Sequence, residues 1–277
     1  HNVPREAVRG EDNLAEALQW LEDAGPGRNY LFLHFNDPHQ PFTQPAPFDR
    51  AFGGDPSQAN VELPYSIYQD GFPRSEKQRN VMRFLYDGEV NYVDDRIGAF
   101  LIALKERGLY DDAVIGFVSD HGEQLWEHGG FGHGPAFGGG DALFDEVVRV
   151  PLIIKPGAGE YARGTVVKTQ VRGFDVTPTL MELAGLPEDT DLDAHSLAAF
   201  LQPDAKEAPD RLAVIETSGN RVAIRNQNWK YVLTYSSSPK ENLFDLQADP
   251  GETEDVAEQN AEALSNLRMQ VLDYLLL

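Results

Sequence analysis

Residues 113–118 read Ala-Val-Ile-Gly-Phe-Val and run directly into Ser119-Asp120-His121-Gly122-Glu123. A short, almost wholly apolar run of this kind is typical of a strand buried on both faces of a sheet. Polar residues follow at its carboxyl end, which is where ligands collect in open parallel sheets. Because a turn lets neighbouring side chains converge, the carboxylate of Asp120 and the imidazole of His121 are expected to face the same space.

A glycine-rich segment, Glu-His-Gly-Gly-Phe-Gly-His-Gly at residues 127–134, brings two further imidazoles, those of His128 and His133. Glycine leaves the backbone around these imidazoles open to close approach by a ligand. So many imidazoles and carboxylates within so short a stretch predict a functional site. The alternative interpretation is a polar loop whose histidines cap backbone groups.

The composition excludes several classes of function. The net charge is −22 and there is no lysine- or arginine-rich tract, so the chain lacks the clustered cations that bind nucleic acid. The acidic field would also repel an anionic substrate unless a metal reversed the local sign. No apolar run approaches the roughly 18 residues that span a bilayer. Without any cysteine, these residues form no disulfide, no thiolate metal site and no cysteine nucleophile.

The first part of the chain predicts a helix over residues 11–24, from apolar residues at helical spacing, and then a strand over 29–35. His39 follows the end of that strand. It is restricted between Pro38 and Pro41, and we interpret it as a site residue.

Residues 43–74 are rich in proline and predict a long surface excursion that shapes a substrate mouth. A long helix is predicted next, from the capping pair Ser75 and Gln78 to about Gly108. We expect its acidic residues to form a solvated face or helix-end contacts: Glu89, Asp94 and Asp95. Further elements are predicted as a strand at 148–155, a strand at 166–171 and a helix at 177–185. Strands alternating with helices predict an α/β fold with a mostly parallel central sheet sandwiched by helices.

The pattern changes after a polar, proline-bearing stretch around residues 202–210. We therefore predict one α/β domain over 1–205 and a small α+β subdomain over 206–277. The subdomain is expected to contain a small antiparallel sheet and a closing helix. Its expected elements are strands at 212–216, 221–225 and 230–235, a turn-rich stretch at 243–250 and a helix at 258–277.

Several segments, taken in order, resemble those of one enzyme family. They are residues 32–35 with 37–42, 86–90 with 93–95, 119–123, 132–134 with 148–154, 175–180 with 184–187, 228–231, and 243–246 with 249–252. Together they run from about residue 13 to residue 257, and their order makes the match specific. The chain resembles the sulfatase family of the alkaline-phosphatase superfamily.

The resemblance implies an alkaline-phosphatase-like fold and a metal-dependent sulfuric ester hydrolase. It implies that Asp120 and His121 ligate a divalent cation, with calcium first and manganese or zinc as the alternatives. His39 would hold a sulfate oxygen or protonate the leaving alkoxide. His133 stands where many relatives have a lysine, and it would contact the sulfuryl or phosphoryl oxygens. We place His128 with His39 and His133 as a substrate-binding candidate.

The chain departs from the family pattern at its amino-terminal side. The family supplies there two more acidic metal ligands, a Lys-x-His pair and a formylglycine made within a Cys/Ser-x-Pro/Ala-x-Arg motif. None of these is present in this sequence. The chain therefore looks like the carboxy-terminal two-thirds of a longer enzyme whose nucleophile lies outside it, and we expect this part alone to be inactive.

Other interpretations stay open. One is a phosphonate or phosphodiester hydrolase, or a phosphoethanolamine transferase, of the same superfamily. Another is a non-catalytic remnant that keeps the scaffold. The expected partner is a small-molecule or carbohydrate sulfate ester, and the resemblance favours a periplasmic or secreted protein. Neither the esterified alcohol nor the oligomeric state can be inferred from the sequence.

Overall fold

The structure is a computed structural model that describes residues 9–40, 42–53, 75–134, 143–187, 191–205, 211–217 and 220–276. Most of the predicted excursion, residues 54–74, lies outside these ranges. The chain divides into two compact units, His1–Asp111 and Asp112–Leu277. Among the described residues, no helix combines the length and the apolar character needed to cross a membrane.

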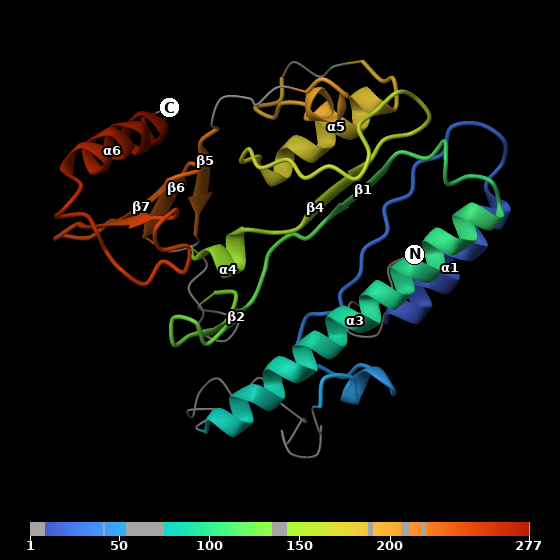
Figure 1. The fold of residues 1–277 in the computed structure, drawn as a ribbon, viewed down its shortest axis with the longest axis horizontal. Coiled ribbons are helices and arrows are strands. Elements are labelled where there is room, and N and C mark those ends of the chain that lie inside the picture. The colour runs from blue at the N-terminus through green and yellow to red at the C-terminus, as the bar shows by residue number, and fades with distance from the viewer. Residues whose placement is uncertain are drawn as a thin grey trace. The chain divides into compact units, whose positions relative to one another are not determined.

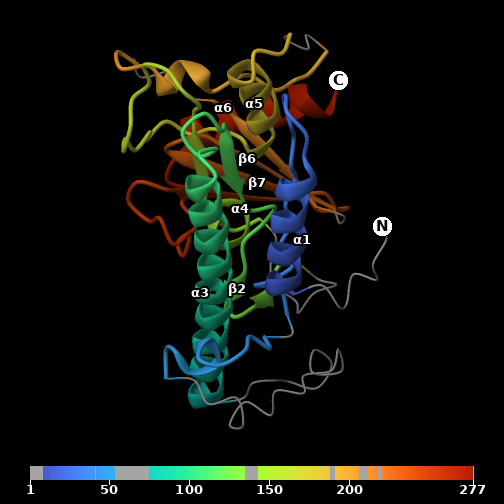
Figure 2. The same ribbon diagram turned by 90° about the vertical axis from the view of Figure 1, so that its right-hand side faces the viewer.

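Two helices that lie side by side dominate the first unit (Figures 1 and 2). They are α1, Gly10–Asp23, and α3, Glu76–Glu106, and both were predicted. Helix α3 begins with the predicted capping box, in which Ser75 and Gln78 satisfy each other's backbone amides. A short 3₁₀ helix, η1, covers Phe48–Arg50.

The strand predicted at residues 29–35 is wrong, because this segment forms no ladder with any described residue. Tyr30 and Phe32 are 78% and 72% exposed. Apolar and aromatic residues favour a strand only where a neighbouring strand satisfies their backbone groups.

In the second unit, β1, Ile115–Val118, pairs with β4, Leu152–Lys155. The pairing is antiparallel, and Phe117 and Ile153 are 37% and 62% exposed. The prediction that β1 is buried on both faces is therefore wrong. The expected parallel pairing is also not found among the described strands. The described part of the intervening chain, residues 119–134 and 143–151, contains no long crossover helix of the kind that joins parallel strands, and β4 runs in the opposite direction.

The chain between β1 and β4 forms a small hairpin and a single helical turn. The hairpin strands are β2, Gln124–Leu125, and β3, Phe131–Gly132, and the helical turn is α4, Asp145–Val148. After β4, the predicted strand at 166–171 does not form, and Val166 is 86% exposed. The predicted helix appears as α5, Val176–Leu183, flanked by the 3₁₀ helices η3, Gly173–Asp175, and η4, Ala198–Leu201.

The carboxy-terminal part is a small antiparallel sheet covered by a helix, as predicted, and the sheet has four strands where three were expected (Figure 1). Its elements are β5, Ala213–Glu216; β6, Arg221–Arg225; β7, Trp229–Thr234; β8, Lys240–Asp245; and α6, Ala261–Leu275. One side of the sheet packs against α6 through Val222, Ile224, Tyr231, Leu243, Leu267 and Val271. Strand β8 was missed. Its last residues were interpreted as the start of the turn-rich stretch at 243–250, and its first residues were assigned to no element. The domain boundary near residue 205 stays a prediction.

Candidate metal centre

The turn that leaves β1 is held by its own polar groups. Oγ of Ser119 donates to the His121 carbonyl at 2.7 Å, and the His121 amide donates to Oδ1 of Asp120 at 2.9 Å. Nδ1 of His121 lies 2.9 Å from the carbonyl oxygen of Gly122. A carbonyl only accepts, so Nδ1 carries the proton and a neutral His121 offers the lone pair of Nε2. That is a common arrangement of a metal-binding histidine.

Gly122 fixes this turn against α4. Its amide donates to the carbonyl of Val147 at 2.7 Å. A Cβ at this position would lie 2.0 Å from the carbonyl oxygen of Glu146, which is far inside van der Waals contact. Only glycine therefore lets the turn approach α4 this closely.

The β2–β3 hairpin brings Glu123 and His133 together. Gln124 pairs with Gly132, so the residues just outside this pair face each other across the hairpin. Nδ1 of His133 lies 2.8 Å from Oε2 of Glu123, and the two side chains are only 10% and 7% exposed. A buried carboxylate is costly unless it is hydrogen-bonded, and this bond meets that requirement.

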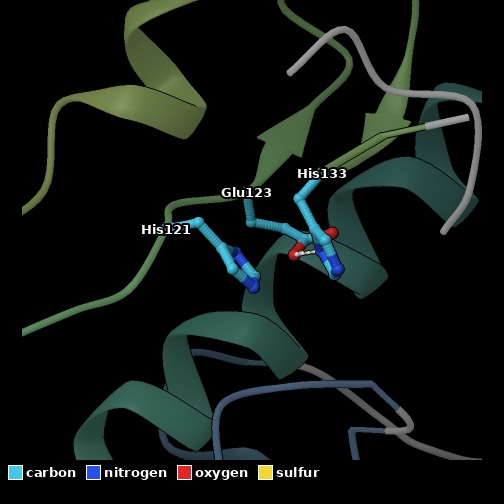
Figure 3. A group of neighbouring side chains, drawn as sticks. All are labelled: His121, Glu123 and His133. Carbon is cyan, nitrogen blue, oxygen red and sulfur yellow. Dashed lines mark hydrogen bonds and ion pairs between the residues drawn. The ribbon is translucent and has the colours of Figure 1, made fainter. Parts of the chain in front are cut away.

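The turn and the hairpin together form one cluster of His121, Glu123 and His133. Their potential ligand atoms all lie within 4.8 Å of one another. The rings of His121 and His133 stack with centroids 4.0 Å apart and an interplanar angle of 28°. Figure 3 shows the three side chains turned toward one another, with Glu123 and His133 joined by their hydrogen bond. Two imidazoles and a carboxylate are a donor set that zinc and similar ions bind.

Asp120, predicted as a metal ligand with His121, lies at the margin of this cluster. Its side chain is 76% exposed, and its Oδ2 is 3.8 Å from Nε2 of His121. A carboxylate oxygen and an imidazole nitrogen placed in this way fit a divalent cation chemically. The assignment of Asp120 and His121 as the ligands stays a prediction.

His128 lies at the tip of the hairpin and not among the clustered ligand atoms. Its ring stacks on that of Phe144, with the ring centroids 3.5 Å apart and an interplanar angle of 5°. Its Nε2 lies 3.4 Å from Oε2 of Glu146. It lines an open hollow of about 680 Å³. The other lining residues are Gln124, Glu127, Gly129, Gly130, Phe144, Glu252 and Thr253. The sequence placed His128 near His133, and the hairpin places it at the opposite end.

A buried group of charges ties α4 to the carboxy-terminal sheet, and sequence reasoning missed it. Nζ of Lys230, on a side chain 1% exposed, lies 2.6 Å from both Oδ1 of Asp145 and Oε1 of Glu252. Arg225 adds two bonds to the carboxylate of Asp145, at 3.0 and 2.8 Å. The only sequence signal was that the family-like segments at 228–231 and 249–252 contain Lys230 and Glu252.

The two carboxylates of this group differ in their acidity. Burial opposes ionisation of Asp145, but the bonds from Arg225 and Lys230 outweigh it and lower the pKa of Asp145 below its ordinary value. At Glu252, burial dominates and raises the pKa, although Lys230 opposes the rise. Asp145 is therefore the firmly charged partner of the lysine.

His39 lies in the first unit. Its amide donates to the carbonyl of Asn36 at 2.9 Å, and its Nδ1 lies 2.6 Å from the carbonyl oxygen of Gln40. The carbonyl again places a proton on Nδ1. Its proposed contact with the ester stays a prediction.

Glu89 corrects one expectation about α3, because it is 2% exposed and does not belong to a solvated face. Its Oε1 accepts the amide of Thr43 at 2.5 Å, and the Gln44 side chain donates to the Leu85 carbonyl of the same helix at 2.9 Å. Burial raises the pKa of Glu89 to about 7. These bonds anchor the segment that follows His39 onto α3.

Comparison with family models gives two matches. Residues 3–186 match the model described as Sulfatase. Residues 140–275 match the model described as N-sulphoglucosamine sulphohydrolase, C-terminal.

Individual proteins agree with these matches. Choline-sulfatase of Rhizobium meliloti is 32% identical over 209 residues, covering 74% of this chain and 38% of that protein. The multifunctional alkaline phosphatase superfamily protein PehA of Trinickia caryophylli is 25% identical over 308 residues, which cover 94% of this chain and 58% of PehA. The phosphonate monoester hydrolase of Silicibacter pomeroyi superposes with a TM-score of 0.71 at 24% identity, covering 96% and 60%. The predicted alkaline-phosphatase-like fold class, with its small carboxy-terminal antiparallel sheet and closing helix, is thereby confirmed, while β1 and β4 pair in antiparallel fashion. The chain spans 58% of the length of PehA and 38% of the length of the choline-sulfatase.

Proposed function

The chain belongs to the sulfatase family of the alkaline-phosphatase superfamily, and from this premise we propose that it carries cation-binding residues and ester-binding residues of an enzyme that hydrolyses sulfate esters. The observation that carries the proposal is the meeting of His121 and His133 directly after β1, with their rings 4.0 Å apart. Groups that hold a cation and groups that contact an ester must lie this close to act on one reacting centre.

In this proposal Asp120 and His121 hold a divalent cation. When bound, such a cation lowers the pKa of a neighbouring nucleophile and neutralises the sulfuryl oxygens. Calcium, the first expectation from the resemblance, prefers a shell made wholly of oxygen. The imidazole of His121 adds manganese and zinc as alternatives, and calcium stays the first expectation.

Two histidines would contact the ester. The hydrogen bond from Nδ1 to Glu123 would hold the ring of His133 for a contact with the sulfuryl oxygens. His39, oriented by its bond to Gln40, would protonate the departing oxygen as a general acid. The hollow beside His128 and Phe144 offers room for the alcohol part of the ester.

The nucleophile completes the chemistry, and we assign it to a segment that these 277 residues do not contain. The longer relatives motivate this assignment, since the chain covers 58% and 38% of the two that were compared. The test is to express the complete open reading frame with a formylglycine-generating enzyme and to measure hydrolysis of p-nitrophenyl sulfate. Turnover that requires a divalent cation supports the proposal, and no turnover with any cation tested contradicts it.

A phosphonate or phosphodiester hydrolase is the second candidate, and the likeness to the phosphonate monoester hydrolase of Silicibacter pomeroyi over 96% of this chain supports it. The same preparation separates the two. A larger kcat/KM for p-nitrophenyl phenylphosphonate than for p-nitrophenyl sulfate would favour this second candidate. A failure on both substrates would favour a non-catalytic remnant.

A further inference from the structure

We propose that Glu89 is a positioning residue for His39, because its carboxyl group holds the segment that follows His39 against α3. The inference rests on the proposed function for the use of His39 on the ester. The position of the His39 ring is measured without turnover, so the two can fail separately. All of the contacts involved lie within the first unit.

The ring of His39 is tied to the chain that follows it. Its Nδ1 donates to the carbonyl oxygen of Gln40 at 2.6 Å, so the direction of the ring depends on the backbone at Gln40. Phe42 comes two positions later, and its side chain is buried. The rings of Phe42 and Tyr86 of α3 meet edge to face with their centroids 5.8 Å apart. A displacement of Phe42 from α3 would therefore also displace the ring of His39.

Glu89 supplies the polar part of this attachment. Its Oε1 accepts the amide of Thr43 at 2.5 Å, and the amide of Gln44 also bonds to its carboxyl group. The side chain of Gln44 donates to the Leu85 carbonyl at 2.9 Å. Residues 42–44 thus bind to one turn of α3, and Glu89 is the side chain of that turn that accepts their amides.

Gly88 lets the segment approach this turn closely. A Cβ at Gly88 would lie 2.6 Å from the carbonyl oxygen of Phe48, which is inside van der Waals contact. A glycine at this position of α3 costs helix stability relative to alanine, and the close approach gives it a reason. The turn that carries Glu89 is therefore shaped to receive the segment after His39.

The charges around Glu89 also point to a role beyond stability. Glu89 is 2% exposed, and burial raises its pKa to about 7 although bonds from backbone amides oppose the rise. The charge of Asp37 raises this pKa further, and Arg9, which also donates to Oγ1 of Thr43 at 3.0 Å, lowers it. His39 therefore lies in the sequence between Asp37 and the segment bound by Glu89. Acids with strongly shifted pKa values gather at functional sites.

The test compares Glu89→Ala with Glu89→Gln and with Glu106→Ala, a matched change at an exposed acid of the same helix. On an ester with a poor leaving group, Glu89→Ala should lower kcat of the complete protein by roughly 10- to 100-fold with little change in KM, because the general acid is misplaced. Glu89→Gln keeps an oxygen for the Thr43 amide and should restore most of the rate. Glu106→Ala should behave as the wild type.

A double variant separates positioning from a general loss of stability. If Glu89 acts through His39, Glu89→Ala should lower the rate no further in a His39→Ala background, since the acid is already absent. Independent effects that multiply in the double variant would overturn the inference.

Histidine resonances provide the readout that needs no turnover. In the complete protein with isotope-labelled histidine, the His39 signal is assigned by its loss in His39→Gln. Glu89→Ala should shift or broaden that signal, and Glu106→Ala should not. Circular dichroism checks that each variant is folded. Glu89→Asp, which retracts the carboxylate by one methylene, replaces Glu89→Ala if the alanine variant is unfolded.

An unmoved His39 signal in the folded Glu89 variant overturns the inference. If the signal moves but the complete protein hydrolyses no ester, the proposed function fails and the positioning of His39 by Glu89 stands.

Discussion

Nζ of Lys230 lies 2.6 Å from Oδ1 of Asp145, so a buried ion pair joins the carboxy-terminal sheet to the first residue of α4. The carbonyl of Val147, also in α4, accepts a hydrogen bond from the Gly122 amide. The sheet therefore supports the turn that carries His121, although it contributes no side chain to the metal cluster.

Replacing Lys230 by methionine should destabilise the chain by about 3–5 kcal/mol, because it removes the lysine partner of the buried Glu252 carboxylate and leaves Asp145 with Arg225 alone. Urea denaturation measures the change. Lys240→Met, at an exposed lysine, is the control and should stay within about 0.5 kcal/mol of the wild type. A Lys230 variant as stable as the wild type would show that the pair does not support α4.

Gly122→Ala should displace the turn from α4, because the new Cβ would lie 2.0 Å from the Glu146 carbonyl oxygen. We expect a loss of about 1–3 kcal/mol in stability and weaker metal binding. Gly98→Ala has open space around its Cβ and lies within α3, so it should be neutral or slightly stabilising. Equal behaviour of the two variants in urea denaturation and zinc titration would count against the close approach.

Glu89 should make stability depend on pH. Its pKa rises from 4.5 in the unfolded chain to about 7 in the folded one, so between these values the folded state holds more protons. Its contribution is fully present below about pH 4.5 and is lost as the pH rises through 7, by up to about 3 kcal/mol.

Glu89→Gln isolates this effect, since the amide keeps an oxygen for the Thr43 N–H and does not titrate. The stability of the variant relative to the wild type should rise from pH 4.5 to pH 7.5, as followed by urea midpoints. The same comparison with Glu106→Gln, at an exposed acid of α3, should be flat. A flat result for Glu89→Gln would mean that Glu89 ionises normally.

Asp120→Ala should lower kcat of the complete enzyme on p-nitrophenyl sulfate to background, because the cation would lose its exposed carboxylate ligand. The melting temperature should change little, since the Asp120 side chain is 76% exposed. Normal turnover would remove Asp120 from the site.

His39→Ala should slow esters with poor leaving groups more than esters with good ones. A general acid matters most where the departing oxygen is most basic. The slope of log kcat/KM against the leaving-group pKa measures this effect. An unchanged slope would assign His39 a role in binding and not in proton transfer.

The sequence predicted what local pattern decides. The capping pair Ser75–Gln78 and the apolar spacing of α3 located that helix, and alternating residues located β6 and β7. The prediction of a strand at 29–35 failed, because strand propensity does not show whether a partner strand is present.

The site was predicted only in part, because long-range contacts leave no local signal. Sequence proximity placed His128 beside His133, and the hairpin turn that separates them could not be inferred from the glycines alone. Glu89 appeared to be one acid among several on α3, since the amide of Thr43 that it accepts lies far away in sequence. The same reason hid Lys230, whose partner Asp145 lies on a different element.

The central claim is that a cation binds directly after β1 at the meeting point of the turn and the hairpin. Anomalous diffraction at the zinc edge, from crystals of the chain grown with zinc, tests it most directly. The account predicts one strong peak within bonding distance of Asp120 and His121. A peak elsewhere, with none at these two residues, would contradict it.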